Sequence, residues 1–541
     1  MSDQAREEWW QSAVVYQVYP RSFRDASGDG VGDLEGLREK LGYLSDTLGV
    51  DAIWIGPFYP SPMADFGYDI ADHRDVDPLF GDLAVLDRLM EDAHAAGLKV
   101  LIDFVPNHTS DRHPWFAASR RSRDDPLRDW YVWRDPGPDG SPPNNWLSVF
   151  GGSAWELDGP TGQVYLHSFL VEQPDLNWRN PAVREAMLDT MRFWLDRGVD
   201  GFRIDAPLFM MKDPGERDNP PNHAGIVRIH KPMGAYDAQL HLYDQGHPDI
   251  HDVFRVMRAV LDEYDPPRTS IGEIHEFDPR TLGSYYGEAL RGLNMPANFG
   301  LMKTPWTAAG VRAVVDALEA GIPLHGWPNW VLGTHDDPRL ATRLGGDEAR
   351  QAAVLLLTLR GSPTLYYGDE LGMREADIPP EKQRDPWARR EPGLGRDGCR
   401  TPMQWSAGPG GGFTAAPEPW LPMGADHDVR NVETELRDPD SMLGLYRRLL
   451  RLRRRSRALR RGAYRPLDGV PAECFAYVRE EGAGRAAVVI SFCSDPLTVD
   501  HPDLAGRIEV STERASEGRE VAGRLELGPQ EAVVLGRLTH G

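Results

Sequence analysis

The sequence contains little cysteine: three residues in 541, at Cys399, Cys474 and Cys493. No two of them form a CxxC pair, so their spacing argues against a cysteine-bound metal cluster and against the disulfide framework of small secreted domains. The composition, 40% hydrophobic and 26% charged, is too apolar for a disordered chain. We expect a globular protein built from two or three packed units.

Long apolar runs are also missing. None reaches the roughly 18 residues that would indicate a membrane span. The segment MSDQAREEWWQSAVVYQVYP at the start is acidic and lacks the basic region, apolar run and cleavage site of a secretory signal. We therefore expect a cytoplasmic protein with no membrane partner.

Positive charge is in deficit, with 60 Lys and Arg against 83 Asp and Glu and a formal net charge of -23. This balance repels nucleic-acid phosphates and favours a neutral small molecule as the partner. One basic segment, SMLGLYRRLLRLRRRSRALRR from Ser441, could be a nucleic-acid patch, but its leucines recur at helical spacing. The favoured interpretation is a final barrel helix with a solvated basic face.

Short β-rich runs alternate with amphipathic helical stretches, a pattern typical of a parallel sheet covered by helices. The stretches DLAVLDRLMEDAHAAG and PAVREAMLDTMRFWLDRG carry apolar residues at i, i+3 and i+4. A series of eight such units favours an α/β fold of the (β/α)8 TIM barrel type over an open doubly wound sheet. The candidate strands begin at Ala13, Ala52, Lys99, Gly201, Thr269, Met295, Asn329 and Ser362.

Two regions depart from this alternation. Residues 108–180 are rich in Trp, Pro, Asn and Gly and show no long helical pattern, which predicts a small inserted domain after the third strand. Residues 461–541 contain short alternating runs such as RAAVVISFC, which predict a C-terminal antiparallel β domain. The barrel would then comprise residues 1–107 and 181–460.

The predicted strand ends are unusually polar. Any one of these side chains could belong to a structural ion pair, but a charge in an apolar strand is costly unless it is paired or functional. Because active sites of TIM barrels lie at the carboxyl ends of the strands, we interpret the whole group as one site. Its members are Asp103, Asn107, His108, Arg203, Asp205, Glu273, His335 and Asp336.

Four of these strand ends, DFVPNH, GFRIDA, GEI and the HD of LGTHD, resemble the signature segments of the α-amylase family, in the family's order. Flanking blocks also match: YQVYPRSF, GYDI, NNWLSVFGG, QPDLNW and RTPMQW. Together they are similar to the α-glucosidase and oligo-1,6-glucosidase branch of glycoside hydrolase family 13. The resemblance covers all but about the last 80 residues.

The resemblance implies a retaining glycosidase with Asp205 as nucleophile and Glu273 as acid/base, whose carboxyl groups would lie about 5–5.5 Å apart. Arg203 precedes Asp205 by two residues, so in a strand both side chains project to the same side. Its charge would keep Asp205 ionised. Glu273 has no adjacent cation in the sequence, and we expect partial desolvation to raise its pKa, as a general acid requires.

The family pattern implies further substrate contacts. Asp336 would be the third carboxylate and would bind the 2- and 3-hydroxyls of the sugar. His108 and His335 would donate hydrogen bonds to the same sugar. A metal-binding role for these histidines is disfavoured, because neither has HxxxH or HxH spacing. A tyrosine would stack on the sugar, although it could be an ordinary rim aromatic. Asp65 and Arg400 would pair, bind the 4-hydroxyl of the terminal glucose and close the pocket beyond it. These residues are His108, His335, Tyr68, Asp65 and Arg400.

Ala206 follows the proposed nucleophile. In this branch of the family, valine at this position accompanies α-1,6 cleavage and alanine accompanies α-1,4 cleavage. We therefore expect maltose and short malto-oligosaccharides as substrates, with oligo-1,6-glucosidase activity as an alternative.

The segment DASGDGVGD places oxygen ligands at alternate positions: the side chains of Asp25, Ser27, Asp29 and Asp33 and the carbonyl of Val31. Hard oxygen ligands in a glycine-rich loop suit Ca²⁺ or, less well, Mg²⁺. Related glucosidases bind a structural divalent ion here. The loop begins like an EF-hand but has glycine instead of glutamate at its twelfth position, and a simple acidic turn is the alternative.

Other functions stay open. A transglucosylase or an isomerase such as sucrose isomerase or trehalose synthase would share the covalent intermediate. The RLDRD-type segment of sucrose isomerases is absent after the sixth strand, where the chain reads GLMKTPW. A non-catalytic scaffold relative is disfavoured, because all three carboxylates are present. The oligomeric state is not indicated by the sequence.

Overall fold

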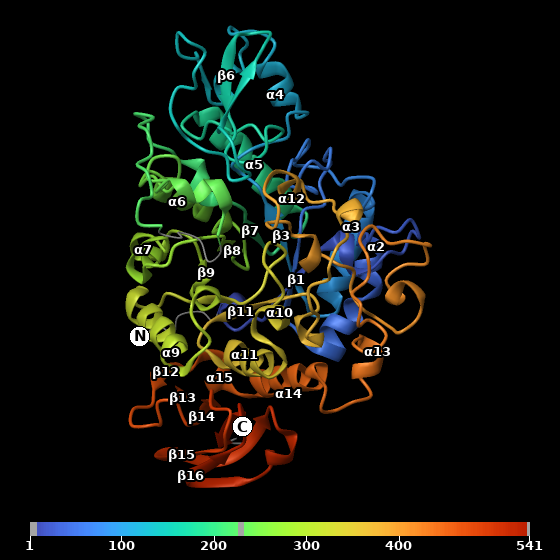
Figure 1. Ribbon diagram of the computed structural model, residues 1–541, viewed down its shortest axis with the longest axis vertical. Helices are drawn as coiled ribbons and strands as arrows, with labels where there is room; N and C mark the ends of the chain where they lie inside the picture. The colour runs from blue at the N-terminus through green and yellow to red at the C-terminus, as the bar shows by residue number, and fades with distance from the viewer. Residues whose placement is uncertain (1–7, 226–231, 538–541) are drawn as a thin grey trace.

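A computed structural model describes residues 8–225 and 232–537. Eight parallel strands close into a barrel in the order β1-β11-β10-β9-β8-β7-β3-β2, which confirms the predicted TIM barrel (Figure 1). Each begins within two residues of a predicted strand. The strands are β1 Val15–Val18, β2 Ala52–Ile55, β3 Lys99–Phe104, β7 Gly201–Ile204, β8 Thr269–Gly272, β9 Met295–Asn298, β10 Asn329–Val331 and β11 Ser362–Tyr366.

Helices surround the barrel, and their ends follow local sequence rules. Asp82 caps α3 by accepting a hydrogen bond from the Val85 amide (2.8 Å), and Asn180 caps α5, which begins with proline. The buried positions of α3 recur at helical spacing, so one face packs against the strands. The longer barrel helices are α3 Leu83–Ala95, α5 Pro181–Asp196, α6 Ile250–Leu261, α9 Ala308–Gly321, α11 Gly346–Thr358 and α14 Met442–Arg455.

Strand register places the charged side chains. β3 pairs with β7 so that Asp103 lies opposite Arg203, and β7 pairs with β8 so that Arg203 lies opposite Ile271. All strands of the barrel are parallel, so their carboxyl ends open at the same end. This register brings Asp205 and Glu273, which follow β7 and β8, to neighbouring positions at that end.

An inserted unit follows β3 and lies at the top of Figure 1. Its antiparallel sheet has the order β4-β6-β5, formed by Trp133–Arg134, Gln163–Leu166 and Trp155–Asp158. The short helix α4 (Pro114–Ser119) packs on this sheet through Phe116, whose ring stacks on Trp133 with centroids 5.6 Å apart. Aromatic packing therefore holds together a unit with little regular structure.

A six-stranded antiparallel sheet forms the opposite end of the molecule in Figure 1. Its order is β12-β13-β14-β17-β15-β16. The strands are Ala463–Pro466, Cys474–Glu481, Gly484–Ser491, Ala532–Arg537, Leu497–Ser511 and Glu520–Leu527, in that spatial order.

The basic segment forms α14 and α15 (Arg457–Arg461) between the barrel and this sheet. The leucines of α14 are buried, as helical spacing predicted. Arg453 is an exception to the expected solvated face: it is 2% exposed and donates to the carbonyl oxygens of Leu357 (3.0 Å) and Gly361 (2.6 Å). Within the described ranges, no helix has both the length and the apolar character needed to cross a membrane.

Candidate active site

A cavity of about 380 Å³ opens at the carboxyl ends of the barrel strands. Most of the residues predicted from the strand ends line it, and Arg203 and Arg400 contact its carboxylates. Apolar and aromatic side chains form much of the remaining wall. The predicted residues in the lining are Asp65, Tyr68, His108, Asp205, Ala206, Glu273, His335 and Asp336.

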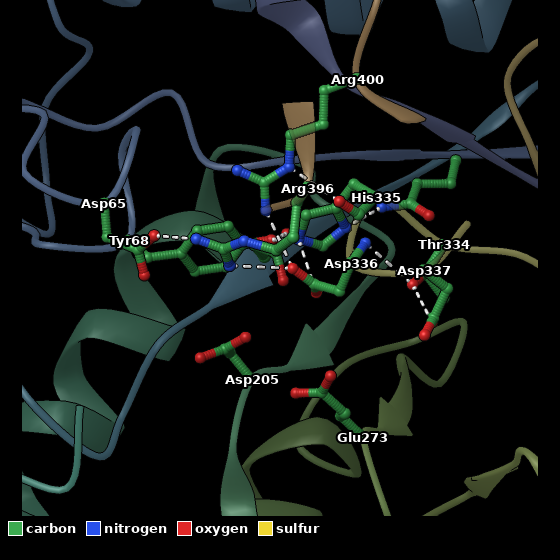
Figure 2. Close-up of polar contacts among 12 residues, drawn as sticks. Asp65, Tyr68, Asp205, Glu273, Thr334, His335, Asp336, Asp337, Arg396 and Arg400 are labelled. Carbon is green, nitrogen blue, oxygen red and sulfur yellow. Dashed lines mark hydrogen bonds and ion pairs between the residues drawn. The ribbon is translucent and has the colours of Figure 1, made fainter. Parts of the chain in front are cut away.

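Arg203 connects three carboxylates. Its Nη1 donates to Asp205 Oδ1 (2.5 Å) and Asp103 Oδ1 (2.9 Å), and its Nη2 lies 2.8 Å from Glu273 Oε1. The guanidinium also lies 4.9 Å from the ring centre of Trp54. A single side chain therefore spans Asp205 and Glu273, whose carboxyl groups Figure 2 shows next to each other.

Burial and this shared arginine set the charges of the carboxyl pair. Burial raises the pKa of Asp205 well above its ordinary value despite Arg203, and repulsion from Glu273 and Asp103 adds to the rise. Burial acts on Glu273 as well, but Arg203 and His275 outweigh it and lower the pKa of Glu273 to about 2. Arg203 thus favours the ionised form of both carboxyl groups, and the direction for Glu273 is opposite to the rise expected from the sequence. The expectation assigned Arg203 to Asp205 alone, whereas the barrel also brings it to Glu273.

Ala206 occupies a strained turn between the two carboxylates. Its φ and ψ are 43° and 39°, in the left-handed region that non-glycine residues seldom adopt. The turn aims its amide at Glu273 Oε2 (3.0 Å), and its methyl group lines the cavity. Backbone strain next to a proposed nucleophile is typical of a functional site.

Asp336, which follows β10, is bound by two arginines (Figure 2). Its Oδ1 accepts hydrogen bonds from Arg396 Nη1 (3.0 Å) and Arg400 Nη2 (2.9 Å). Arg396 Nη2 also donates to Asp65 Oδ1 (2.7 Å). The pair expected between Asp65 and Arg400 is therefore corrected: Asp65 pairs with Arg396, and Arg400 pairs with Asp336.

Arg396 and its third carboxylate partner, Asp385, are not singled out by the sequence. Arg396 donates to Asp385 through Nε (2.9 Å) and Nη2 (2.8 Å), and its charge outweighs burial to lower the pKa of Asp385. Asp385 precedes Pro386 and caps α12 (Pro386–Arg390), a helix start that the Asp-Pro pair could have signalled. The pairing with Arg396 carries no such local signal.

Tyr68 and His335 form a parallel stack, with centroids 5.3 Å apart and planes at 3°. Gln17 Nε2 donates to His335 Nδ1 (2.7 Å), His335 Nε2 lies 2.7 Å from the Tyr68 hydroxyl, and that hydroxyl donates to Asp103 Oδ2 (3.2 Å). Burial lowers the pKa of His335 to about 3, so the ring is neutral with its hydrogen on Nε2. That nitrogen lies 3.1 Å from Asp336 Oδ2, which places a donor beside the third carboxylate.

His108 also lines the cavity. Its Nε2 is 3.2 Å from the Tyr68 carbonyl oxygen and 3.1 Å from Gln173 Nε2. Burial lowers the pKa of His108 to about 4, so this ring is also neutral at neutral pH. Gln173, from the QPDLNW block, also donates to Asp65 Oδ2 (3.4 Å), so one amide links His108 to Asp65.

The predicted metal loop folds around its own carboxylates. Asp25 Oδ1 accepts from Ser27 Oγ (3.0 Å) and Gly28 N (2.6 Å), and its Oδ2 accepts from Gly30 N (2.9 Å). Asp33 Oδ2 accepts from Ser27 N (2.9 Å). Burial raises the pKa of Asp33, and the nearby charge of Asp25 contributes to the rise. Ser27 thus links two of the predicted acidic ligands.

The remaining predicted ligands, Asp29 and Val31, lie nearer the surface, where Asp29 Oδ1 accepts from the Val31 amide (2.8 Å). The loop supplies hard oxygens of the type that Ca²⁺ takes. Amide donors nevertheless satisfy much of this oxygen set. In the part of the chain that the structure describes, no group of three or more His, Cys, Asp or Glu side chains is arranged to hold a metal ion.

Comparison with known proteins agrees with this geometry. Residues 17–462 match the family described as alpha amylase, catalytic domain. A probable α-glucosidase of Rhizobium meliloti (strain 1021) is 40% identical over 92% of this chain and 91% of its own length, and an oligo-1,6-glucosidase of Heyndrickxia coagulans is 38% identical over 92% and 94%. A crystal structure of an α-glucosyl transfer enzyme is 44% identical, covers 98% of this chain and 100% of its own, and has a TM-score of 0.91.

Proposed function

The chain belongs to the α-amylase family and is a glycoside hydrolase, and on that premise we propose that it is a retaining, exo-acting α-glucosidase. The observation that carries the proposal is the pair Asp205 and Glu273, which follow the adjacent strands β7 and β8 and line the same cavity. The two Nη atoms of Arg203 each contact one carboxyl group of the pair. Two carboxyl groups with one on each side of the scissile bond are what retaining hydrolysis requires.

In the proposed reaction Asp205 attacks the anomeric carbon while Glu273 gives a proton to the leaving oxygen. The resulting glucosyl-enzyme is then cleaved by water, whose proton Glu273 accepts. Asp336, His108, His335 and Tyr68 would bind the sugar during both steps. Support for these contacts is their common presence around the cavity, with neutral imidazoles able to donate hydrogen bonds.

This chemistry requires an ionised nucleophile and a protonated acid, whereas the shared contact with Arg203 favours the ionised form of both Asp205 and Glu273. We infer that an entering sugar separates Glu273 from Arg203 Nη2. Arg203 would then act on Asp205 and Asp103 alone. Loss of the contact raises the pKa of Glu273, while undivided pairing lowers the pKa of Asp205.

Exo-action is supported by the ion network on the far wall. Arg396 joins Asp65 to Asp336, and Arg400 binds the same oxygen of Asp336. Arg396 also contacts the rings of Phe150 and Trp387, whose centroids lie 5.3 and 5.7 Å from its Cζ. This network would close the cavity beyond a terminal glucose and bind its 4-hydroxyl.

The proposal is tested with p-nitrophenyl-α-glucoside and maltose. We expect Asp205→Asn and Glu273→Gln each to lose at least about 100-fold in kcat, with folding unchanged by circular dichroism. The exposed Asp124→Asn is the matched control and should retain full activity. Initial release of α-glucose, detected by proton NMR, should show retention; β-glucose, or persistent activity in both variants, would refute the assignment.

We propose a preference for α-1,4 linkages, supported by the small side chain of Ala206 on the cavity wall. Valine at this position would crowd the leaving sugar and strain the left-handed backbone. We expect Ala206→Val to raise the ratio of isomaltose to maltose turnover by about 10-fold, since one or two carbons in a pocket discriminate on that scale. Equal turnover of both sugars by the unaltered protein would contradict the preference.

Transfer of glucose to a sugar acceptor is a second candidate activity, favoured by the 44% identity to a solved α-glucosyl transfer enzyme. Hydrolysis and transfer share the glucosyl-enzyme and differ in whether water or a hydroxyl captures it. At high maltose concentration we expect trisaccharide to accumulate before glucose alone dominates. If chromatography detects no trisaccharide, the activity is limited to hydrolysis.

We also propose that the loop at residues 25–33 binds Ca²⁺, with Mg²⁺ as the less suitable ion. Support comes from the contact of Ser27 with both Asp25 and Asp33, whose like charges a cation would neutralise. Calcium added to the dialysed protein should raise its Tm, and Asp29→Ala should reduce that shift. An unchanged Tm together with no metal by elemental analysis would refute the site.

We propose a cytoplasmic location because the three cysteines are present as free thiols. Cys399, Cys474 and Cys493 are free, and burial raises the pKa of the first two to about 12. Reduced thiols are typical of cytosolic proteins. Recovery of the activity in a secreted or membrane fraction would contradict this proposal.

A further inference from the structure

Glu273 has contacts to three donors. Oε1 lies 2.8 Å from Arg203 Nη2 and 3.4 Å from His275 Nε2, and Oε2 accepts from the Ala206 amide at 3.0 Å. A guanidinium and a backbone amide can only donate hydrogen bonds, whereas an imidazole nitrogen donates or accepts according to its tautomer. Of these three partners, His275 is therefore the one that can donate to Oε1 when Glu273 is a carboxylate and accept a hydrogen bond from Oε1 when that oxygen is protonated.

The position of the His275 ring is fixed by packing. His275 follows Glu273 by two residues in the loop after β8, and its ring stacks on Phe299, which follows β9, with centroids 4.5 Å apart and planes at 22°. Both rings line the cavity. The stack holds the Nε2 edge toward Glu273 while leaving the side chain 27% exposed.

Arg203 and His275 compete for the same oxygen. At 2.8 Å the charged guanidinium is the stronger partner of Oε1, and at 3.4 Å the imidazole is near the outer limit of a hydrogen bond. A Glu273 side chain that leaves Arg203 keeps the Ala206 amide on Oε2, but Oε1 loses its stronger partner unless another group takes that place. His275 is already placed to shorten its contact with Oε1 as that of Arg203 lengthens.

We propose that His275 is a positioning residue for Glu273: it holds the carboxyl toward the leaving oxygen once the contact with Arg203 is broken. The inference rests on the proposed glucosidase function. In the first step the Glu273 proton moves to the glycosidic oxygen as the bond to C1 breaks and an Asp205 oxygen bonds to C1. In the second step a water proton moves to Glu273 as the water oxygen replaces Asp205 on C1. His275 contacts the carboxyl in both states and is not itself consumed.

Leaving-group dependence separates this role from a merely structural one. Fluoride departs from α-glucosyl fluoride with little need of a proton, whereas the glucose released from maltose needs the acid. We expect His275→Phe, which keeps a ring on Phe299 but has no polar edge, to lower kcat/KM on maltose about 10-fold, since only part of the acid contribution is lost. The same variant should keep kcat/KM on α-glucosyl fluoride within about 2-fold, because this quantity reports the first step, in which fluoride needs little acid.

His275→Gln provides the rescue, because its amide can donate or accept near the position of Nε2. It should recover most of the activity on maltose. Equal losses on both substrates in His275→Phe, unchanged turnover of maltose, or failure of His275→Gln to recover activity would each overturn the positioning role. An unaltered protein that cleaves neither substrate would instead refute the proposed function itself.

Discussion

Buried arginines lie both at the cavity and at the interface between the barrel and the C-terminal sheet, but their partners differ. At the cavity, Arg203 and Arg396 meet carboxylates, whereas between the barrel and the C-terminal sheet, Arg453 and Arg479 meet backbone carbonyl oxygens. Arg479 donates to the carbonyls of Thr358 (2.6 Å) and, through Nε, Gly462 (3.0 Å). The first pattern orders side chains that can react, and the second fastens one unit of the fold to another.

The pKa values of these arginines follow from their partners. Burial lowers the pKa of each, but the charges of nearby carboxylates raise those of Arg203 and Arg396 well above the ordinary value. For Arg453 and Arg479 burial prevails, and their pKa values fall to about 10 and about 9. Carbonyl dipoles satisfy the hydrogen bonds of a buried cation without compensating its charge as a carboxylate does.

The largest expected effect comes from removing the arginine that pairs with the carboxylates at the cavity. Arg203→Gln leaves Asp103, Asp205 and Glu273 buried together without their cation, so repulsion and burial favour their protonated forms. We expect kcat on p-nitrophenyl-α-glucoside to fall at least about 100-fold, the scale of losing a preorganised charge at a reaction centre. Retention of wild-type kcat would show that Arg203 is structural, like Arg453 and Arg479.

The opposite result is expected at the C-terminal interface. Arg479→Met removes donors from two buried carbonyls and should lower the free energy of unfolding by about 1–3 kcal/mol, measured as a lower Tm, with kcat unchanged. Arg457→Met is the matched control: its exposed pair with Glu481 (3.5 Å) contributes little. A raised Tm in Arg479→Met would mean that burying the charge costs more than its hydrogen bonds return.

The smallest effect concerns a neutral buried group in the inserted unit. His113 caps α4 by accepting from the Trp115 amide (3.1 Å), and burial lowers its pKa to about 2. Between pH 6.5 and about 2 the unfolded chain binds a proton there and the folded chain does not, so stability falls as the pH is lowered through this range. The slope contributed is at most about 1.4 kcal/mol per pH unit.

His113→Asn keeps a capping acceptor and removes the titration. We expect its Tm to decline less steeply than that of the unaltered protein between pH 6.5 and 5. Every other ionisable group is common to both proteins, so the difference between the two curves reports on His113. Parallel curves would show that His113 is protonated in the folded state.

Much of the fold could be predicted because it depends on local patterns. Apolar runs at the strand starts, helical periodicity and caps such as Asp82 and Asn180 occur within short segments, and the structure confirms the barrel they indicate. The resemblance to the α-amylase family is likewise confirmed. The role of Arg396 could not be predicted, because its partners Asp65 and Asp336 are distant in sequence.

By itself the sequence determined which chemical groups end the barrel strands, since period-two and period-3.6 patterns fix the strands and hence their ends. Only the tertiary structure decided how those groups share charges. Closing the barrel carried Arg203 to Glu273 as well as to Asp205, and Asp65 to Arg396 instead of Arg400. Electrostatic coupling depends on distance through space, and separation along the chain does not specify that distance.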